Sequence, residues 1–227
     1  MTESYDRDGD RQRLLASILN HVPFDGWSDI ALRSAAQETG IPTDRVLNAF
    51  PGGAREALIL WHEVAVQQMI EAMSEPAIAH LRTRERVAAA IKLRLQANLT
   101  HREAVRAGCT MLLMPQNTAI ATRLLYNTVN AIWYACGDKS TDHNFYTKRG
   151  LLAAVYSATV MYWLNDKSPD CSATWAFLDR RIAEVMQIPQ LIGQATSRLR
   201  AIADHVPTPQ NLFRRARSPR GRRRPVF

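Results

Sequence analysis

The sequence contains few of the residue patterns that mark enzymes and metal sites. Its three cysteines, Cys109, Cys136 and Cys171, have no paired spacing, and we interpret them as reduced thiols in a cytosolic or matrix-like compartment. His62 is followed by Val66 where a zinc-binding helix would need a second histidine. Cys-x-x-Cys, Gly-x-Ser-x-Gly and glycine-rich phosphate loops do not occur. We therefore predict no catalytic residues, no metal site and no enzyme activity.

Long apolar runs and alternating patterns are also missing. Residues 150–164 carry no charge, but fifteen helical residues extend only about 22 Å, short of the roughly 30 Å hydrocarbon core of a bilayer. Their apolar side chains point in every direction around a helix, so we expect a buried central helix or one wall of an apolar cavity. Since no segment alternates with period two, the sequence predicts an all-α fold.

Acidic residues are absent from the end of the chain. From Arg214 onward there are seven arginines and no acid, so the net charge of +8 leaves 8 − 7 = +1 for the preceding residues. We predict that residues 207–227 form a disordered basic tail, which either lies on anionic lipid or nucleic acid or only aids solubility. The first ten residues contain four acids, the wrong charge for a targeting peptide. We expect a bacterial protein or one whose presequence has been removed.

The first part of the chain reads as a small helical region. Residues 1–50 predict three short helices, at 11–20, 28–38 and 43–50, with Gly40 in the turn before the third. A helix, a glycine-containing turn and another helix make the helix-turn-helix pattern. The region holds five basic and eight acidic residues, a net charge of −3 that repels a polyanion. The sequence therefore argues against DNA binding.

The candidate recognition helix gives a second reason against DNA binding. Its only arginine, Arg45, stands beside Asp44, and little else in the helix could read base edges. A ligand-responsive transcriptional regulator of the tetracycline-repressor (TetR) type is nevertheless kept as the alternative function, because the long helix predicted at 54–73 also resembles that class.

Further helices are predicted by apolar residues at three- and four-residue spacing. They cover residues 54–73, 81–99, 102–113 and 118–136. Gly137 can end the last of these, and Asp142 can cap the helix that follows. Ser168, Pro169 and Asp170 then form a strong helix start, with a capping hydroxyl and a proline in the first turn.

The polar turn after residue 136 and the segments that follow it resemble a known family. The residues that carry the resemblance are Gly137-Asp138-Lys139-Ser140-Thr141-Asp142, Asn144, Tyr146-Thr147, Arg149, Leu152-Ala153-Ala154 and Ser168-Pro169-Asp170. They are similar to the signature of the ubiquinone (coenzyme Q) biosynthesis accessory proteins. The similarity extends from about His21 to about Met186.

The resemblance implies a fold and a function. It implies a TetR-like helical bundle with a helix-turn-helix-like region at 1–50 and a helical lipid-binding domain at 51–188. It further implies a non-enzymatic protein, peripheral on the inner face of the bacterial cytoplasmic membrane or on the mitochondrial matrix side. Such a protein binds an isoprenoid quinone precursor or a phospholipid and presents the precursor to the demethoxyubiquinone hydroxylase. A homodimer is left open, and no specific nucleic-acid partner is expected.

The same resemblance implies an apolar ligand site. The candidate lipid-binding residues are Leu112, Met114, Leu125, Val129, Val155, Thr159, Trp163, Leu178 and Ile182. Without the resemblance, the simplest interpretation is that these side chains pack against one another, because a core is the usual place for such residues. A ligand cavity and a filled core therefore remain alternatives.

Two further surfaces are implied. The candidate hydroxylase-binding residues lie around the polar turn and are Asn130, Ile132, Asp142, Phe145, Tyr146 and Arg149. The predicted amphipathic helix at 189–206 carries one apolar stripe, and its candidate membrane-binding residues are Leu191, Ile192, Leu199, Ile202 and Val206. That helix could instead dock on the body of the protein or on a dimer partner, as amphipathic surface helices usually do.

Overall fold

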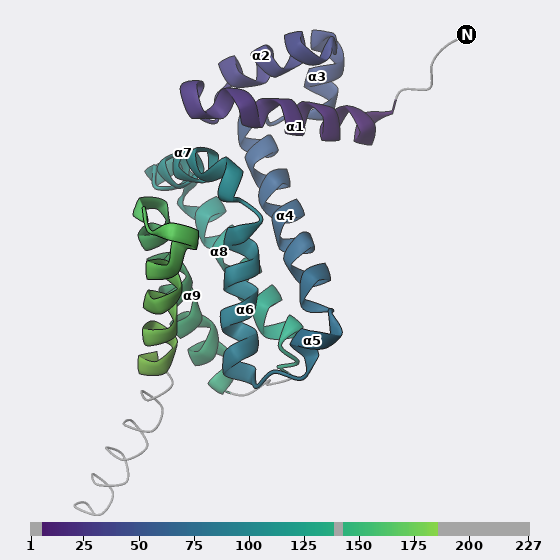
Figure 1. Ribbon diagram of the computed structural model, residues 1–227. Helices are drawn as coiled ribbons and strands as arrows, with labels where there is room; N and C mark the ends of the chain where they lie inside the picture. Colours follow the sequence, from purple (N-terminus) through teal and green to yellow (C-terminus); the bar gives the residue numbers. More distant parts are fainter. Residues whose placement is uncertain (1–5, 139–142, 186–227) are drawn as a thin grey trace, which may run out of the picture. The chain divides into compact units, whose positions relative to one another are not determined.

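The computed structural model describes residues 6–138 and 143–185 (Figure 1). The chain divides into two compact units, residues 1–182 and residues 183–227. The first unit contains helices α1 to α9. All regular structure in the described residues is helical, which confirms the predicted all-α fold.

The three-helix region forms as predicted. It consists of α1 (Arg7–Asp25), α2 (Asp29–Thr39) and α3 (Thr43–Ala49). Ser28 begins α2, since its hydroxyl accepts a hydrogen bond of 3.3 Å from a backbone N–H three residues on. Gly40 ends α2 in the left-handed conformation, with φ of 67°.

Helix α1 extends beyond the predicted 11–20 at both ends. The Asp6 carboxylate accepts a hydrogen bond of 3.0 Å from the N–H of Gly9, which caps a first turn that apolar periodicity does not mark. At the other end Pro23 lies inside the helix, and the chain leaves it only at Gly26. Apolar spacing found the buried middle of the helix, while its ends depend on capping.

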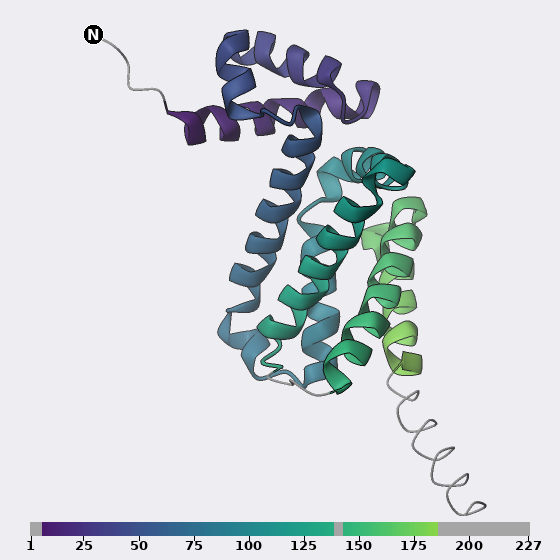
Figure 2. The ribbon, with the colours of Figure 1, turned by 180° about the vertical axis from the view of Figure 1, so that it is seen from behind.

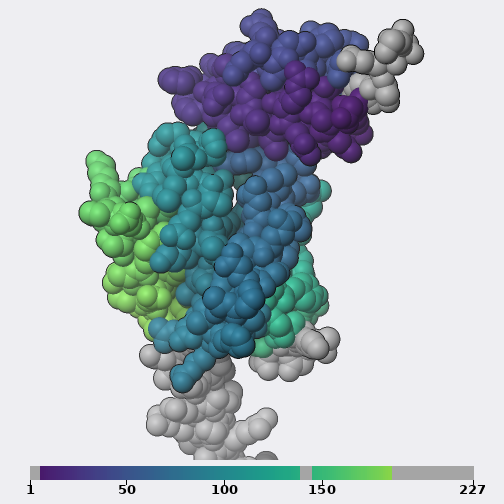
Figure 3. Space-filling model, turned by 45° about the vertical axis from the view of Figure 1, so that its right-hand side comes forward, coloured from purple at the N-terminus to yellow at the C-terminus, as the bar shows by residue number. Residues whose placement is uncertain are grey.

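Longer helices follow the three-helix region. They are α4 (Ala54–Met73), α6 (Thr83–Gln96), α7 (Arg102–Leu112), α8 (Thr118–Ala135) and α9 (His143–Asn165), joined in part by the short α5 (Pro76–Ala79), η1 (Leu99–His101) and η2 (Pro115–Asn117). Helix α8 packs between α4 and α9 (Figure 2), and α6 lies beside α4 (Figure 3). The predicted bounds of α4, α6, α7 and α8 agree with the structure to within three residues.

Helix α7 is held close to α4 and to Trp27. The indole N–H of Trp27 donates to the carbonyl of Ala104 at 3.0 Å. One turn further on, a Cβ on Gly108 would lie 3.2 Å from a methyl carbon of Leu58 and 3.4 Å from the Trp27 nitrogen. Because glycine has no Cβ, α7 can approach both neighbours at this point.

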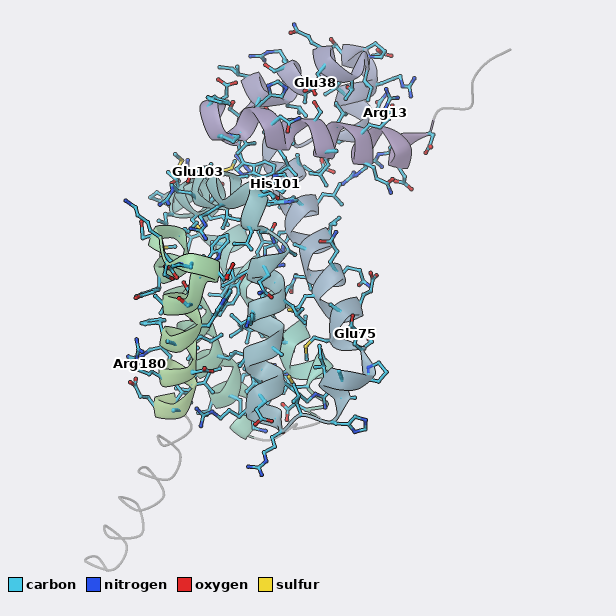
Figure 4. All side chains as sticks on the ribbon, in the orientation of Figure 1. Arg13, Glu38, Glu75, His101, Glu103 and Arg180 are labelled. Atoms are coloured by element: carbon cyan, nitrogen blue, oxygen red, sulfur yellow. The ribbon has the colours of Figure 1, made fainter. Side chains whose placement is uncertain are left out.

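Charged side chains lie mostly on the outside of the helices. Glu38, Glu75 and Glu103, labelled in Figure 4, are all exposed. The interior is left to apolar residues such as Leu124, Ile132 and Trp163.

Helix α9 contains the charge-free stretch that was predicted to be buried on all sides, and this prediction is only partly right. Val155 and Trp163 are buried, but Met161 and Tyr162 are exposed. The Tyr162 ring stacks on Phe177 from the helix that begins at residue 172, with ring centroids 4.6 Å apart. A side of α9 thus faces solvent although it carries no charge.

The turn after α9 is organised by a buried carboxylate. The two oxygens of Asp166 accept hydrogen bonds from the N–H of Ser168 at 2.7 Å and of Thr174 at 2.8 Å, and the Thr174 hydroxyl also donates to Asp166. Partial burial acts to raise the pKa of Asp166, but these hydrogen bonds outweigh it and hold the pKa below its ordinary range. Ser168 was predicted to cap this helix, and its hydroxyl does accept from a backbone N–H.

We expect Asp166→Ala to lower the free energy of unfolding by about 1–2 kcal/mol, because it removes a helix cap and leaves the buried Thr174 hydroxyl without its acceptor. The low pKa means that the carboxylate stabilises the fold above its ordinary titration range and that this contribution is lost as the pH falls. Urea unfolding at pH 7 measures the change, with Lys167→Ala at an exposed neighbouring position as the control. Equal unfolding curves for the two variants would contradict the capping role.

Candidate functional site

An apolar cavity of about 420 Å³ lies inside the helical body. It is enclosed by side chains from α4, α6, α7, α8 and α9. The lining residues are Leu58, Trp61, His62, Ala65, Arg94, Leu95, Asn98, Val105, Gly108, Cys109, Leu112, Leu113, Ala121, Leu124, Leu125, Tyr156, Ser157, Val160 and Met161. Its volume falls in the range of small-molecule sites.

The cavity is open to the surface at exposed apolar side chains. Two of its lining side chains are exposed, Leu113 by 79% and Met161 by 46%. Met114, also exposed, follows Leu113 in the chain. An apolar rim of this kind allows a long apolar ligand to extend out of the cavity without losing contact with the protein.

The first polar group of the lining is His62, on α4. Its Nε2 lies 3.0 Å from the hydroxyl of Thr128, and that hydroxyl donates its one hydrogen to the carbonyl of Leu124 at 3.0 Å. With that hydrogen on the Leu124 carbonyl, the imidazole donates from Nε2 and leaves Nδ1 as an acceptor, whereas the other tautomer reverses both roles. Nδ1 is buried and has no hydrogen-bond partner among the described residues. Burial, helped by the charge of Arg94, lowers the pKa of His62 to about 3.

The second polar group is Arg94, on α6. Only 6% of its surface is exposed, and no acidic residue of the described chain forms an ion pair with it. Its Nε donates to the hydroxyl of Tyr156 at 2.9 Å, while Nη1 has no partner among the described residues. None of the cavity-lining side chains is acidic. The cavity is therefore apolar with one buried positive charge.

The structure distributes the candidate lipid-binding residues over the cavity and the core. Leu112 and Leu125 line the cavity. Met114 is exposed beside its opening. The remaining residues are buried without lining it, and these are Val129, Val155, Thr159, Trp163, Leu178 and Ile182.

Other lining residues could have been found in the sequence. Leu58, Trp61, His62 and Ala65 follow one another at helical spacing on α4 and form a single inward stripe. The polar groups of the lining gave no such signal, because Arg94 and Tyr156 are 62 positions apart and meet only in the folded chain.

The candidate hydroxylase-binding residues are also divided. Tyr146 is 74% exposed, whereas Ile132 and Arg149 are buried. The Arg149 guanidinium donates to the side-chain carbonyl of Asn130 at 2.8 Å and lies over the Phe145 ring, 3.4 Å from its centroid. Arg149 thus ties α9 to α8 and supports the aromatic residues beside it.

Several candidate residues lie outside the described part of the chain. They are Asp142 of the polar turn and the membrane-binding set Leu191, Ile192, Leu199, Ile202 and Val206. The arginine-rich tail at 207–227 lies outside it as well. No helix in the described ranges is long and apolar enough to cross a membrane.

The arginine of the candidate recognition helix is engaged within the protein. Both oxygens of the Asp10 carboxylate, on α1, accept hydrogen bonds from Arg45 at 2.7 Å. Asp10 is only 2% exposed, so it needs this cation. Contact with a DNA base would require Arg45 to leave a buried carboxylate unpaired.

Comparison with solved structures defines the class of the fold. A TetR transcriptional regulator from Nitrosomonas europaea ATCC 19718 superposes with a TM-score of 0.67 at 18% identity, covering 78% of this chain and 98% of that one. The predicted TetR-like fold is confirmed. At this level of identity the likeness concerns the fold alone.

Comparison with protein families identifies the relatives. Residues 118–189 match the COQ9 family model. The chain is 31% identical over 194 residues to the mitochondrial ubiquinone biosynthesis protein COQ9 of Xenopus tropicalis, covering 82% of this chain and 61% of that protein. It is 28% identical over 208 residues to the human COQ9 protein, covering 86% and 64%. The chain thus spans about 60% of the length of these relatives, and its resemblance to ubiquinone biosynthesis proteins is confirmed.

We expect the stability of the protein to depend on pH through His62. The imidazole stays neutral in the folded state down to about pH 3 but takes up a proton near pH 6.5 when the chain unfolds, so stability falls as the pH drops below 6.5. Between pH 7 and 5 the wild-type protein should lose about 2 kcal/mol more than His62→Leu. Urea unfolding of both proteins at the two pH values isolates this difference, since all other titrating groups are shared. The same loss in both proteins would show that folded His62 accepts a proton.

Proposed function

We propose that this chain is a non-enzymatic, lipid-binding accessory protein of ubiquinone biosynthesis. It holds an isoprenoid quinone precursor in the apolar cavity and presents it to the demethoxyubiquinone hydroxylase at a membrane. The cavity is the observation that carries the proposal, because a filled core would leave no place for a lipid. The names of the COQ9 relatives support the pathway.

The size and the opening of the cavity suit an isoprenoid compound. Each buried methylene-sized group contributes about 0.8 kcal/mol, so a few isoprene units inside the cavity account for substantial affinity. A volume of about 420 Å³ holds only part of a long chain. The rest of the tail passes over Leu113 and Met161, or stays in the membrane from which the lipid is taken.

The place of action follows from the relatives and from the remainder of the chain. The COQ9 relatives are named as mitochondrial proteins. We propose that this protein works at the corresponding surface, the matrix side of the inner membrane or the inner face of a bacterial cytoplasmic membrane. The apolar stripe at 189–206 and the basic tail would supply the membrane contact.

The hydroxylase would bind at the exposed aromatic side chains near the polar turn. Tyr134 on α8 is 60% exposed and Tyr146 on α9 is 74% exposed, and Arg149 lies 5.6 Å from the Tyr134 ring centroid. Phe145 contacts Tyr146 edge to face, with ring centroids 5.1 Å apart. Exposed aromatic residues supported by an ordered arginine are typical of the centres of protein interfaces.

The competing function, a DNA-binding regulator, is disfavoured by the Arg45–Asp10 pair and by the charge of −3 in residues 1–50.

We expect the purified protein to carry lipid in about a one-to-one ratio and Ala121→Phe to lose it. Ala121 lines the cavity, so a phenyl ring there occupies the ligand volume. Solvent extraction followed by mass spectrometry measures the bound lipid. Ala119→Phe is the control, because Ala119 is exposed on the same helix. Lipid retained equally by both variants would place it outside the cavity, and a wild-type protein free of lipid would refute the proposal.

We expect Tyr146→Ala to abolish co-purification of the hydroxylase and to make demethoxyubiquinone accumulate in cells. The ring is exposed, so the melting temperature should stay within a few degrees, corresponding to about 1 kcal/mol or less. Phe24→Ala, at an exposed aromatic residue of α1, is the control and should retain the hydroxylase. Intact hydroxylase binding by folded Tyr146→Ala would count against this surface.

A further inference from the structure

The apolar cavity contains two buried nitrogens that the described part of the protein leaves without a partner. One is Nδ1 of His62, an acceptor in the tautomer whose Nε2 donates to Thr128, and the other is Nη1 of Arg94, a donor with positive charge. Both residues line the cavity. A buried polar atom without a hydrogen bond costs about 1–3 kcal/mol, and more when it is charged. Each such atom needs a partner from outside the described chain, which is either water or a ligand.

The surroundings of the two side chains are rigid. His62 is held by the Thr128 hydroxyl, which is itself bonded to the backbone of α8. Arg94 is held by the Tyr156 hydroxyl on α9. Four helices, α4, α6, α8 and α9, thus hold the two side chains beside one apolar space. This arrangement is a preformed binding site for a polar group.

We propose that His62, Arg94 and Tyr156 bind the ring hydroxyl of a phenol-type head group whose apolar part fills the rest of the cavity. The ligand oxygen accepts a hydrogen bond from Arg94, and its O–H donates to His62 Nδ1. This inference rests on the proposed lipid-binding function and adds the chemical class of the head group. The hydroxyl of Tyr156 positions Arg94 through its hydrogen bond with Nε.

A hydroxyl fits this pair better than other head groups do. A carboxylate would accept from Arg94 but would turn lone pairs toward the unprotonated His62 nitrogen. A ketone or an ether oxygen has no hydrogen to give to His62. A phenol has both an acceptor and a donor on one atom, and its aromatic ring suits an apolar lining that includes Trp61.

The binding of matched probes to the lipid-stripped full-length protein tests this inference. The probes are 4-octylphenol, its O-methyl ether 4-octylanisole and decanoic acid, measured by equilibrium dialysis. We expect the phenol to bind about 10- to 100-fold more tightly than the ether, because the ether leaves the buried Nδ1 of His62 without a donor. Equal affinities for phenol and ether would overturn the inference, and so would tighter binding of decanoic acid than of the phenol. Failure of every probe to bind would instead refute the proposed lipid-binding function.

Substitutions then locate the selectivity. His62→Leu should reduce the phenol-to-ether ratio to about one, because only the phenol donates to Nδ1. Arg94→Met should weaken the binding of both probes, because the oxygen of each accepts from Nη1. Arg94→Met should also keep or raise the melting temperature of the ligand-free protein, because it removes a buried charge that has no acidic partner among the described residues. Tyr156→Phe provides a second test without changing the ring, and it should weaken the binding of both probes by loosening Arg94. Gln68→Ala, at an exposed position of α4 outside the lining, is the control and should keep the full ratio. Selectivity retained by His62→Leu, or unchanged affinity of Arg94→Met for both probes, would overturn the assignment.

Discussion

The close approach of α7 to Trp27 and α4 is the contact on which the cavity depends. Trp27 holds the backbone of α7 at Ala104, and Gly108 lets the helix pass within contact distance of Leu58. With a larger residue at 108, α7 would have to move away from α4, and the wall that α7 contributes to the cavity would shift with it. The contact of Trp27, in the three-helix region, with α7 therefore sets the shape of the cavity, although the cavity itself lies wholly among the longer helices.

The cavity also shows a conflict between stability and function. An apolar core of this size would be more stable if it were filled and if Arg94 were replaced by an apolar residue. The protein instead retains an open space, a buried arginine with no acidic partner in the described chain, and a histidine that stays neutral at physiological pH. Departures from the most stable arrangement concentrate at functional sites, and here all three meet in one cavity.

The TetR-like fold does not by itself assign a function. The helix-turn-helix elements are present, yet Arg45 is used to neutralise buried Asp10 and the region carries net negative charge. In a regulator, these elements present a recognition helix. In this protein they anchor α7 through Trp27.

Much of the fold follows from the sequence alone, because local spacing and capping decide where helices begin and end. Apolar periodicity located α4, α6, α7 and α8, and Ser28 and Gly40 marked the ends of α2. The length of α1 was not predicted, because it depends on the Asp6 cap. The exposed side of α9 was not predicted either, because it depends on which neighbouring elements cover that helix. The resemblance to ubiquinone biosynthesis proteins was likewise readable from the residues around the polar turn.

Only the tertiary structure separated the cavity wall from the core, and it placed Arg149 inside rather than on the surface. It alone brought His62, Arg94 and Tyr156 together, because helix packing determines which residues from distant segments meet, and no local pattern encodes it.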